Sequence, residues 1–307
     1  MTRLAVIGGS GFIGKHLVNR LATAGHHVRA LGRSNSGGMA PLSGDREVEW
    51  LWGDFQNEAL LRRAMEGAET VFQLVSTTLP RSSNDDPVYD LVSNVGGSLK
   101  LLLTAVECGV RKVVFLSSGG TIYGTPSILP IPEDHPLEPN CSYGIGKLAI
   151  EKYLKLFRAL HGLDFAIVRL SNPFGEGQPL DRGQGAVSIF LNRVLHDAPI
   201  EIWGDGSAVR DYVYISDAIE GIVAAADRED GSRIYNIGSG IGHSLNEVIA
   251  EIEQVVGKRA TVHYKGARTF DVPANVLCIE RARTELNYSP KVSFRDGICK
   301  TVEWLLR

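Results

Sequence analysis

The chain has 307 residues, of which 44% are hydrophobic and 22% are charged, and its formal net charge is −3. This composition is typical of globular proteins, and the length allows one large α/β unit or two modest domains with a sizeable core. A slightly acidic chain lacks the basic character of nucleic-acid-binding proteins, so we expect no nucleic acid partner.

No targeting or metal-binding pattern accompanies this composition. The apolar run of residues 4–7 is too short for the core of a signal peptide, and no stretch approaches membrane-spanning length. The four cysteines are scattered, without a CxxC pair or a clustered histidine: Cys108, Cys141, Cys278 and Cys299. We therefore expect reduced thiols, a cytoplasmic protein, no membrane association and no metal site.

In the first half of the chain, short apolar runs alternate with amphipathic stretches. Five runs have the length and β-branched content of buried strands: residues 4–8, 27–31, 70–75, 112–118 and 165–170. Helical patterns lie between them, and two of these, at 12–25 and 93–109, end at glycine, a favoured helix stop. This alternation predicts βαβ units and a Rossmann-type doubly wound parallel sheet.

The pattern changes after Arg169. Residues 172–185 form a loop rich in glycine and proline, and a helix-like segment follows at 186–196. We therefore predict an NAD(P)-binding domain over 1–171 and a smaller C-terminal α/β substrate lobe over 172–307. A segment near 213–240 is expected to return to the first domain.

A glycine-rich segment, residues 8–14, lies between the first predicted strand and the first predicted helix. Gly8, Gly11 and Gly14 let the backbone turn tightly and approach a pyrophosphate. The helix start, with Phe12 and Ile13, offers unpaired N–H groups and a favourable dipole to the same anion. A merely tight turn is the alternative interpretation, but the position in an alternating α/β chain favours a dinucleotide site.

The end of the second strand bears on the choice of cofactor. An acidic residue there would accept hydrogen bonds from the ribose hydroxyls of NAD, but the strand ends Leu31-Gly32-Arg33. Arg33 is suited to a 2′-phosphate, which favours NADP; it is equally compatible with a solvated arginine at a strand end. NAD and NADP both remain open at this point.

Tyr143 stands four residues before Lys147 at the start of another helical pattern, so the two side chains share a helix face. Such a pair also occurs by chance on helix surfaces. Its meaning therefore depends on the rest of the chain.

Taken together, Gly8-x-x-Gly11-x-x-Gly14, Tyr143-x-x-x-Lys147 and several motifs between and after them resemble the extended short-chain dehydrogenases/reductases. The likeness is to the NAD-dependent epimerase/dehydratase family, and within it to nucleotide-sugar epimerases of the UDP-glucose 4-epimerase type. It covers nearly the whole chain, with the motifs in the expected order. The resemblance also implies a homodimer, formed through the helices that begin near Asn94 and Tyr143.

The resemblance assigns roles to individual residues. The catalytic set is Tyr143, Lys147, Ser118 and Thr121. Cofactor contacts beyond the glycine loop and Arg33 are Asp54, Phe55, Leu74, Asn94, Ser117, Tyr143 and Lys147. Substrate contacts are Ser118, Tyr143, Asn172, Arg210, Arg268 and Asp271.

The proposed chemistry needs these residue types. A free tyrosine, with a pKa of about 10, is a poor base near neutrality, and a nearby lysine ammonium together with an oxidised nicotinamide stabilises the phenolate. The family usually places its catalytic hydroxyl where this chain has Gly119, so Ser118 and Thr121 share that role. Simpler interpretations remain: a strand-end hydroxyl capping backbone groups, Asn94 as a helix N-cap, and Arg268–Asp271 as a surface ion pair.

The leading functional hypothesis is a nucleotide-diphosphate-sugar 4-epimerase that works through a 4-keto intermediate on UDP-glucose, UDP-galactose or their N-acetyl counterparts. An NAD(P)H-dependent 4-ketoreductase of a deoxy sugar nucleotide would use the same catalytic residues, and Arg33 gives it some support. A 4,6-dehydratase is disfavoured, since Gly120 and Thr121 replace the acidic pair it needs. A redox-silent dinucleotide sensor is the non-enzymatic alternative, although such a protein would be expected to lose these side chains.

Overall fold

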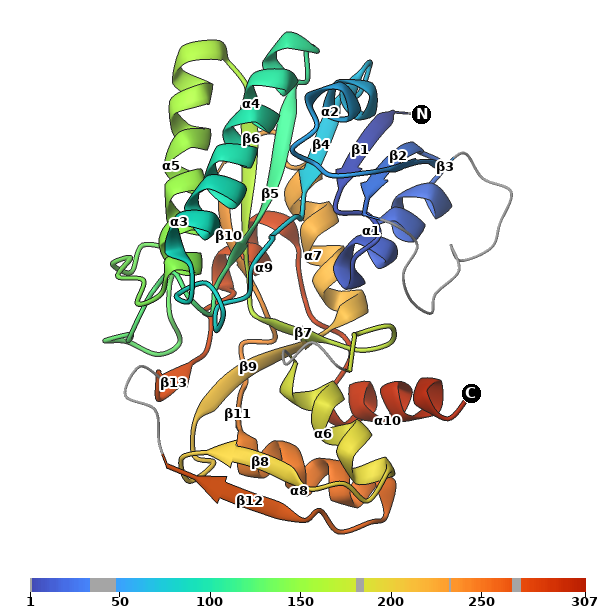
Figure 1. Ribbon diagram of the computed structural model, residues 1–307, viewed down its shortest axis with the longest axis vertical. Helices are drawn as coiled ribbons and strands as arrows, with labels where there is room; N and C mark the ends of the chain where they lie inside the picture. The colour runs from blue at the N-terminus through green and yellow to red at the C-terminus, as the bar shows by residue number, and fades with distance from the viewer. Residues whose placement is uncertain (1, 34–47, 181–184, 232, 267–271) are drawn as a thin grey trace.

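The computed structural model describes residues 2–33, 48–180, 185–231, 233–266 and 272–307. A large parallel sheet with helices on both faces forms one part, and a smaller lobe of short strands and helices lies beyond one end of that sheet (Figure 1). Within the described ranges, no helix combines the length and the apolar character that crossing a membrane requires.

The large sheet has seven strands in the order β10-β6-β5-β4-β1-β2-β3, and every neighbouring pair is parallel. Its strands are β1 (Arg3–Ile7), β2 (His27–Gly32), β3 (Val48–Trp52), β4 (Thr70–Gln73), β5 (Lys112–Ser118), β6 (Asp164–Leu170) and β10 (Ile234–Ile237). The chain runs outward from β1 in both directions, so the strand order reverses between β1 and β4. The predicted doubly wound sheet is therefore confirmed, and ligands bind such sheets at this reversal, beyond the carboxyl ends of the strands.

Helices cover both faces of the sheet. One face carries α1 (Phe12–Thr23) and α7 (Ile215–Asp227), and the other carries α2 (Glu58–Met65), α4 (Gly97–Glu107) and α5 (Ser142–His161). Successive β1 residues alternate between two buried clusters, with Leu4 and Val6 in the first and Ala5 and Ile7 in the second. A strand buried on both faces is necessarily apolar throughout, which is why it appears in the sequence as a continuous apolar run.

The segment after residue 213 contributes to this sheet although it comes late in the chain. β10 pairs in parallel with β6, and α7 packs against α1 and β6. The short helix α9 (Glu280–Leu286) lies against β10 and α7.

In the described part of the chain, the smaller lobe contains two small sheets and three helices. β9 (Val209–Tyr214) pairs with β7 (Asn172–Phe174), β11 (Gly242–Ser244) and β13 (Ala274–Asn275), while β8 (Ile200–Trp203) pairs with β12 (Val262–Lys265). The helices are α6 (Ala186–Leu195), α8 (Leu245–Val256) and α10 (Phe294–Leu305). One continuous buried cluster runs from the α1/α7 face of the large sheet into this lobe, so the two parts share a core.

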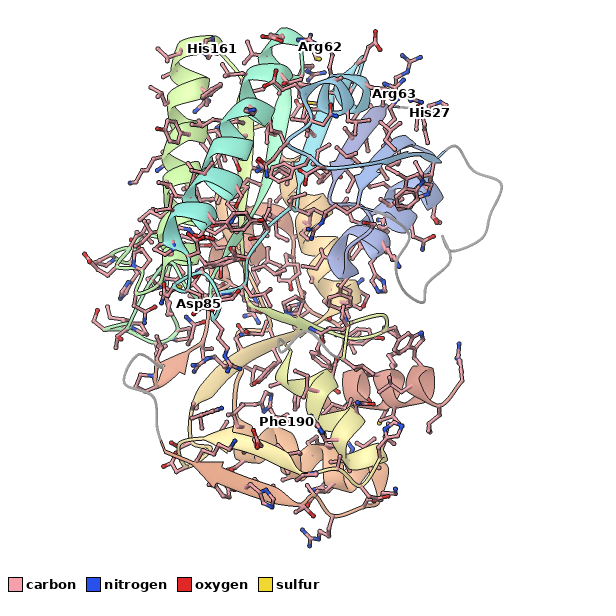
Figure 2. The ribbon with its side chains drawn as sticks, viewed as in Figure 1. His27, Arg62, Arg63, Asp85, His161 and Phe190 are labelled. Carbon is pink, nitrogen blue, oxygen red and sulfur yellow. The ribbon has the colours of Figure 1, made fainter. Side chains whose placement is uncertain are left out.

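Helix α5 spans the large domain, as Figure 2 shows: His161 lies at the end of the domain far from the lobe, and Asp85 lies in the loop after β4 at the end that faces the lobe. Because α5 runs antiparallel to the strands, its first turn lies beside their carboxyl ends. The start of α5, which carries Tyr143, is therefore placed at the edge where a dinucleotide binds.

The helix expected over 93–109 begins six residues earlier. A short turn, α3 (Pro87–Asp90), and a π-helical turn, η1 (Leu91–Gly96), precede α4. Asp86 caps α3 by accepting the Tyr89 N–H (2.9 Å), and Pro87 occupies the first helical position. Asn94 is thus inside a helix rather than its N-cap, and π-turns of this kind occur frequently at functional sites.

Candidate active site

The glycine loop closes tightly around the start of α1. Gly8 has a φ of +97°, and a β-carbon at Gly14 would come within 2.1 Å of the Gly8 carbonyl oxygen. Only glycine fits these positions. Gly11 caps α1 without a side-chain hydrogen bond, and the first turn carries no acidic residue. The N–H groups at the start of α1, including those of Phe12 and Ile13, therefore lack intrahelical partners and face any anion bound there.

The ends of β2 and β4 complete this crevice. The N–H groups of Gly8 and Gly9 donate to the Leu31 carbonyl (2.8 and 3.0 Å), and the Leu74 N–H donates to the Ile7 carbonyl (2.9 Å). A β-carbon at Gly8 would lie 3.1 Å from the Val75 side chain. Leu74 is therefore beside the loop, at the reversal point of the sheet.

Three further cofactor candidates lie at the ends of β2 and β3. The exposed Arg33 follows directly after Gly32, and its guanidinium has no hydrogen bond or ion pair with the described residues. The exposed Asp54 accepts the Gln56 N–H (2.8 Å) through Oδ1, next to a turn that the Gly53 N–H ties to the Gly32 carbonyl (2.9 Å).

The Phe55 ring has a different environment from these two residues. It is buried against Gly97, where a β-carbon would come within 2.6 Å of it. The side chain therefore packs in the core, and only the backbone of the turn remains available to a cofactor.

Tyr143 and Lys147 lie together at the start of α5. The Lys147 Nζ is 5.5 Å from the centre of the Tyr143 ring and 4.8 Å from that of Phe115, and it donates to the Leu116 carbonyl (2.8 Å). The lysine thus bridges α5 and β5 two residues before Ser118. The structure brings the predicted pair to the strand end that carries the predicted hydroxyls.

The electrostatics of this pair differ from the expectation for a ready base. Burial raises the pKa of Tyr143 above its ordinary value, and the nearby Cys141 and Asp90 raise it further. Burial lowers the pKa of Lys147 to about 8, against the opposing effect of Glu151 and Asp90. The side chains of the protein alone do not lower the tyrosine pKa, so phenolate formation requires a further positive charge.

Ser118 and Thr121 flank Gly119 at the end of β5. The Thr121 hydroxyl is buried and has no hydrogen-bond partner among the described residues. A β-carbon at Gly119 would lie 2.5 Å from a Leu277 methyl group, so Leu277 fills the space that a side chain at position 119 would need. Leu277 lies 158 residues away along the chain, and the sequence offered no signal for this replacement.

Ser117, predicted to contact the cofactor, uses its hydroxyl elsewhere. It donates to the buried Glu151 carboxylate (2.6 Å), which also forms an ion pair with Arg169 (2.8 Å). Both charged side chains are only 2% exposed. This buried pair was missed in the sequence, although Glu151 follows Lys147 by one helical turn.

The amide oxygen and the amide nitrogen of the Asn94 side chain also form hydrogen bonds within the protein. Its Oδ1 accepts from the Thr77 N–H (2.8 Å), and its Nδ2 donates to Asp90 (2.9 Å) and Thr78 (3.1 Å). Asn94 therefore shapes the loop after β4 and has no amide hydrogen left for a ligand. Asp90, a buried carboxylate at the centre of this arrangement, was another residue that sequence reasoning missed.

The substrate candidates lie on adjoining strands of the lobe. Asn172, on β7, donates to the Asp211 carbonyl (2.9 Å), and Arg210, on β9, donates to the Val209 carbonyl (2.8 Å). The buried Asp211 carboxylate accepts the N–H groups of Ser239 and Gly240, which fixes this part of β9. Arg268 and Asp271 lie outside the described residues.

The fold, the glycine loop and the Tyr143–Lys147 pair together define a dinucleotide-dependent enzyme class, the extended short-chain dehydrogenases/reductases. The sequence model of the NAD dependent epimerase/dehydratase family matches residues 4–238, and the chain belongs to this family.

Three relatives illustrate the range of the family. A UDP-glucose 4-epimerase of Mycolicibacterium smegmatis is 36% identical, over 98% of each chain. A dTDP-4-dehydro-6-deoxyglucose reductase of Escherichia coli is 32% identical, over 97% of this chain and 96% of the relative. The crystal structure of a Thermotoga maritima UDP-glucose 4-epimerase with UDP-glucose superposes with a TM-score of 0.93 at 32% identity, covering 99% of each chain.

Proposed function

We propose that the protein is a nucleotide-diphosphate-sugar 4-epimerase acting on UDP-glucose and UDP-galactose or their N-acetyl counterparts. The observation that carries the proposal is the Tyr143–Lys147 pair, whose lysine is hydrogen-bonded to β5, in a chain with epimerase relatives along nearly its whole length. The absence of carboxylates at Gly120 and Thr121 argues against a dehydratase.

In this proposal, Tyr143 takes the proton from the sugar 4-hydroxyl and later returns one to the 4-keto oxygen. Lys147 holds positive charge beside the phenolate, and the hydroxyl of Ser118 or Thr121 donates a hydrogen bond to the same sugar oxygen. NAD, when bound, would supply the hydride acceptor and donor and, in its oxidised form, a second positive charge beside that of Lys147. Net redox change is zero, so no reductant is consumed.

Binding of the two ligands divides between the two parts of the fold. We assign the dinucleotide to residues 1–171 through the glycine loop, Arg33, Asp54 and Leu74, and the nucleotide sugar mainly to the 172–307 lobe. Asn172 and Arg210 lie on its adjoining strands β7 and β9, and Arg268 and Asp271 are proposed on the family pattern alone. Arginine is suited to a diphosphate because its planar guanidinium donates two parallel hydrogen bonds.

An NADPH-dependent 4-ketoreductase is the second candidate. Two observations favour it: the 32% identical reductase of Escherichia coli and the exposed Arg33, which has no partner among the described residues and follows the strand end where the cofactor ribose is expected. The cofactor itself distinguishes the two functions, since an epimerase needs a catalytic amount of NAD and a reductase consumes NADPH.

We also propose a homodimer in the cytoplasm. Exposed apolar side chains gather on η1, α4 and α5: Leu91, Val92, Leu103, Ile145, Leu156 and Leu160. Patches of this kind mark interfaces, and a second copy offers a matching apolar face by two-fold symmetry. The four cysteines are free thiols, in keeping with a reducing compartment.

Sedimentation of the wild type and of Leu103→Glu tests the dimer. The charge introduced at position 103 should dissociate it.

Proton NMR of the purified protein with UDP-glucose or UDP-N-acetylglucosamine and a catalytic amount of NAD tests the function. New anomeric signals of the axial 4-hydroxyl sugar, formed without a reductant, are expected. If both sugars remain unchanged and a 4-keto sugar nucleotide is reduced by NADPH, the ketoreductase assignment replaces this one. Cofactor binding without any turnover would indicate a sensor.

A further inference from the structure

Asp90 connects three segments that are distant in sequence. Its carboxylate is only 1% exposed. Oδ1 accepts hydrogen bonds from the Thr78 hydroxyl and from Asn94 Nδ2 (2.9 Å), and Oδ2 accepts one from the Ser142 hydroxyl (2.7 Å). The loop after β4, the η1 turn and the first residue of α5 therefore meet at one carboxylate.

The contacts around Asp90 tie the loop after β4 to the first turn of α5. Asn94 fixes the loop by accepting the Thr77 N–H, and the Ser142 N–H is held by the side chain of Asn84 (2.9 Å). On α5, a β-carbon at Gly146 would lie 3.8 Å from Asp90 Oδ2, so the helix passes directly beside the carboxylate. The residue that anchors the loop thus also anchors the turn that carries Tyr143.

Asp90 has no ion-pair partner among the described residues; its three hydrogen-bond donors are neutral. Burying a carboxylate is costly, and buried charges are normally paired. Its negative charge acts instead on the active-site pair: it adds to the effect of burial in raising the pKa of Tyr143, and it partly opposes the lowering of the Lys147 pKa by burial. A buried carboxylate without a charged partner, next to an active-site pair, marks a candidate functional residue.

We propose that Asp90 is a positioning residue of the reaction, which fixes the first turn of α5 against the loop after β4 and whose negative charge keeps Lys147 cationic beside Tyr143. This role rests on the proposed function, because it presumes that the Tyr143–Lys147 pair performs proton transfer.

The effect on pH dependence has a definite sign. Besides Asp90, the groups that act on the pair are the Cys141 thiol, next to Tyr143, and the Glu151 carboxylate, next to Lys147. Removing the negative charge at position 90 makes the phenolate easier to form and the ammonium easier to lose. Both limbs of the pH–activity profile should therefore move to lower pH.

Asp90→Asn is the main test, because the amide keeps the shape and removes the charge. We expect kcat to fall by about tenfold or more, with KM for the nucleotide sugar little changed and with both pH limbs moved to lower pH. Ser142→Ala is the matched variant: it keeps the charge and cuts one bond to α5, so kcat should fall while the pH limbs stay in place. A normal profile in Asp90→Asn, or a lower kcat with unmoved limbs, would overturn the proposal.

A second measurement does not depend on turnover. Carbon-13 NMR of protein labelled at the lysine Cε, with Lys147→Arg to assign the signal, follows the titration of Lys147 in the wild type and in Asp90→Asn. A lower titration midpoint in the variant supports the proposed charge effect even if no nucleotide sugar reacts, and an equal midpoint contradicts it. If Asp90→Asn does not fold, Ser142→Ala still decides: wild-type kcat in that variant contradicts the positioning role.

Discussion

A buried carboxylate of helix α5, Glu151, and one that lies beside this helix, Asp90, differ in what neutralises them. Glu151 forms an ion pair with Arg169 and accepts a hydrogen bond from the Ser117 hydroxyl, whereas Asp90 accepts hydrogen bonds from neutral donors only, as far as the described ranges extend. Asp90 lies beside the turn that carries Tyr143, and Glu151 lies one turn beyond Lys147. Helix α5 therefore carries one carboxylate that is paired, Glu151, and lies beside another that has no charged partner among the described residues, Asp90.

The Glu151–Arg169 ion pair, called the balanced site below, is part of a wider polar network in the core. Arg169 also donates to the Tyr123 hydroxyl (3.0 Å) and the Glu133 carbonyl (2.8 Å), and the Tyr123 hydroxyl donates to Asn236 (2.7 Å). This network joins β6, β10 and the segment after β5. The paired Glu151 is expected to matter mainly for the fold, and the proposed role of Asp90 lies in the protonation of its neighbours.

The largest effect is expected at the catalytic end of α5. Tyr143→Phe removes the proton-transfer group and should lower kcat by about a thousandfold, within the range typical of general acid–base catalysis. Tyr153→Phe, on the same helix but packed against the second buried cluster, is the matched control and should keep its activity. Turnover is measured by NMR. Comparable activity in the two variants would show that Tyr143 is not the proton-transfer group.

The balanced site should instead govern stability. Arg169→Met leaves Glu151 buried without its partner and should lower the free energy of unfolding by about 3–5 kcal/mol. Adding Glu151→Leu to Arg169→Met should recover much of this loss, because the unpaired charge is then gone. Urea denaturation of the wild type and both variants provides the measurement. A single-variant loss below about 1 kcal/mol would mean that the pair behaves like an exposed one.

A smaller, pH-dependent effect is expected at Lys147. Its pKa of about 8 lies below the ordinary 10.5, so between these values the unfolded chain binds more protons at this site than the folded one. The contribution of Lys147 to the free energy of unfolding therefore rises with pH between about 8 and 10.5. Lys147→Met should be more stable than the wild type by up to about 3 kcal/mol near neutral pH, an advantage that shrinks towards about pH 10. Denaturation at both pH values is the check, and a constant difference would contradict the burial of a charged lysine.

The smallest effect involves a neutral hydrogen bond in the lobe. Asn172→Ala removes the bond to the Asp211 carbonyl and should cost about 1 kcal/mol of stability. If the side chain also contacts the nucleotide sugar, KM should rise with little change in kcat. Steady-state kinetics beside urea denaturation separate the two effects. An unchanged KM would leave Asn172 with a structural role alone.

The sequence predicted the features that depend on neighbouring residues. Strand runs, the glycine loop and the Tyr143–Lys147 spacing are local patterns, because the sheet and helix periods act over a few residues. Asp90 could not be found this way, since its partners Thr78, Asn94 and Ser142 are 4 to 52 residues away.

The sequence also offered no indication of the direction in which two side chains point, although both residues were predicted to contact the cofactor. Ser117 and Phe55 lie next to strand ends, where position suggested a ligand. In the fold, Ser117 donates to Glu151 and the Phe55 ring packs against Gly97. Their partners are 34 and 42 residues away, and no local period encodes contacts at that separation.

The most direct test of a 4-epimerase follows deuterium at the reacting carbon. The protein is incubated with UDP-glucose deuterated at C4 and a catalytic amount of unlabelled NAD, and the sugars and the free cofactor are then examined by NMR and mass spectrometry. Because the hydride leaves and returns to the same carbon, the UDP-galactose formed should keep its deuterium at C4. Deuterium accumulating in free NADH, in proportion to the sugar oxidised, would contradict an epimerase and identify a net oxidoreductase.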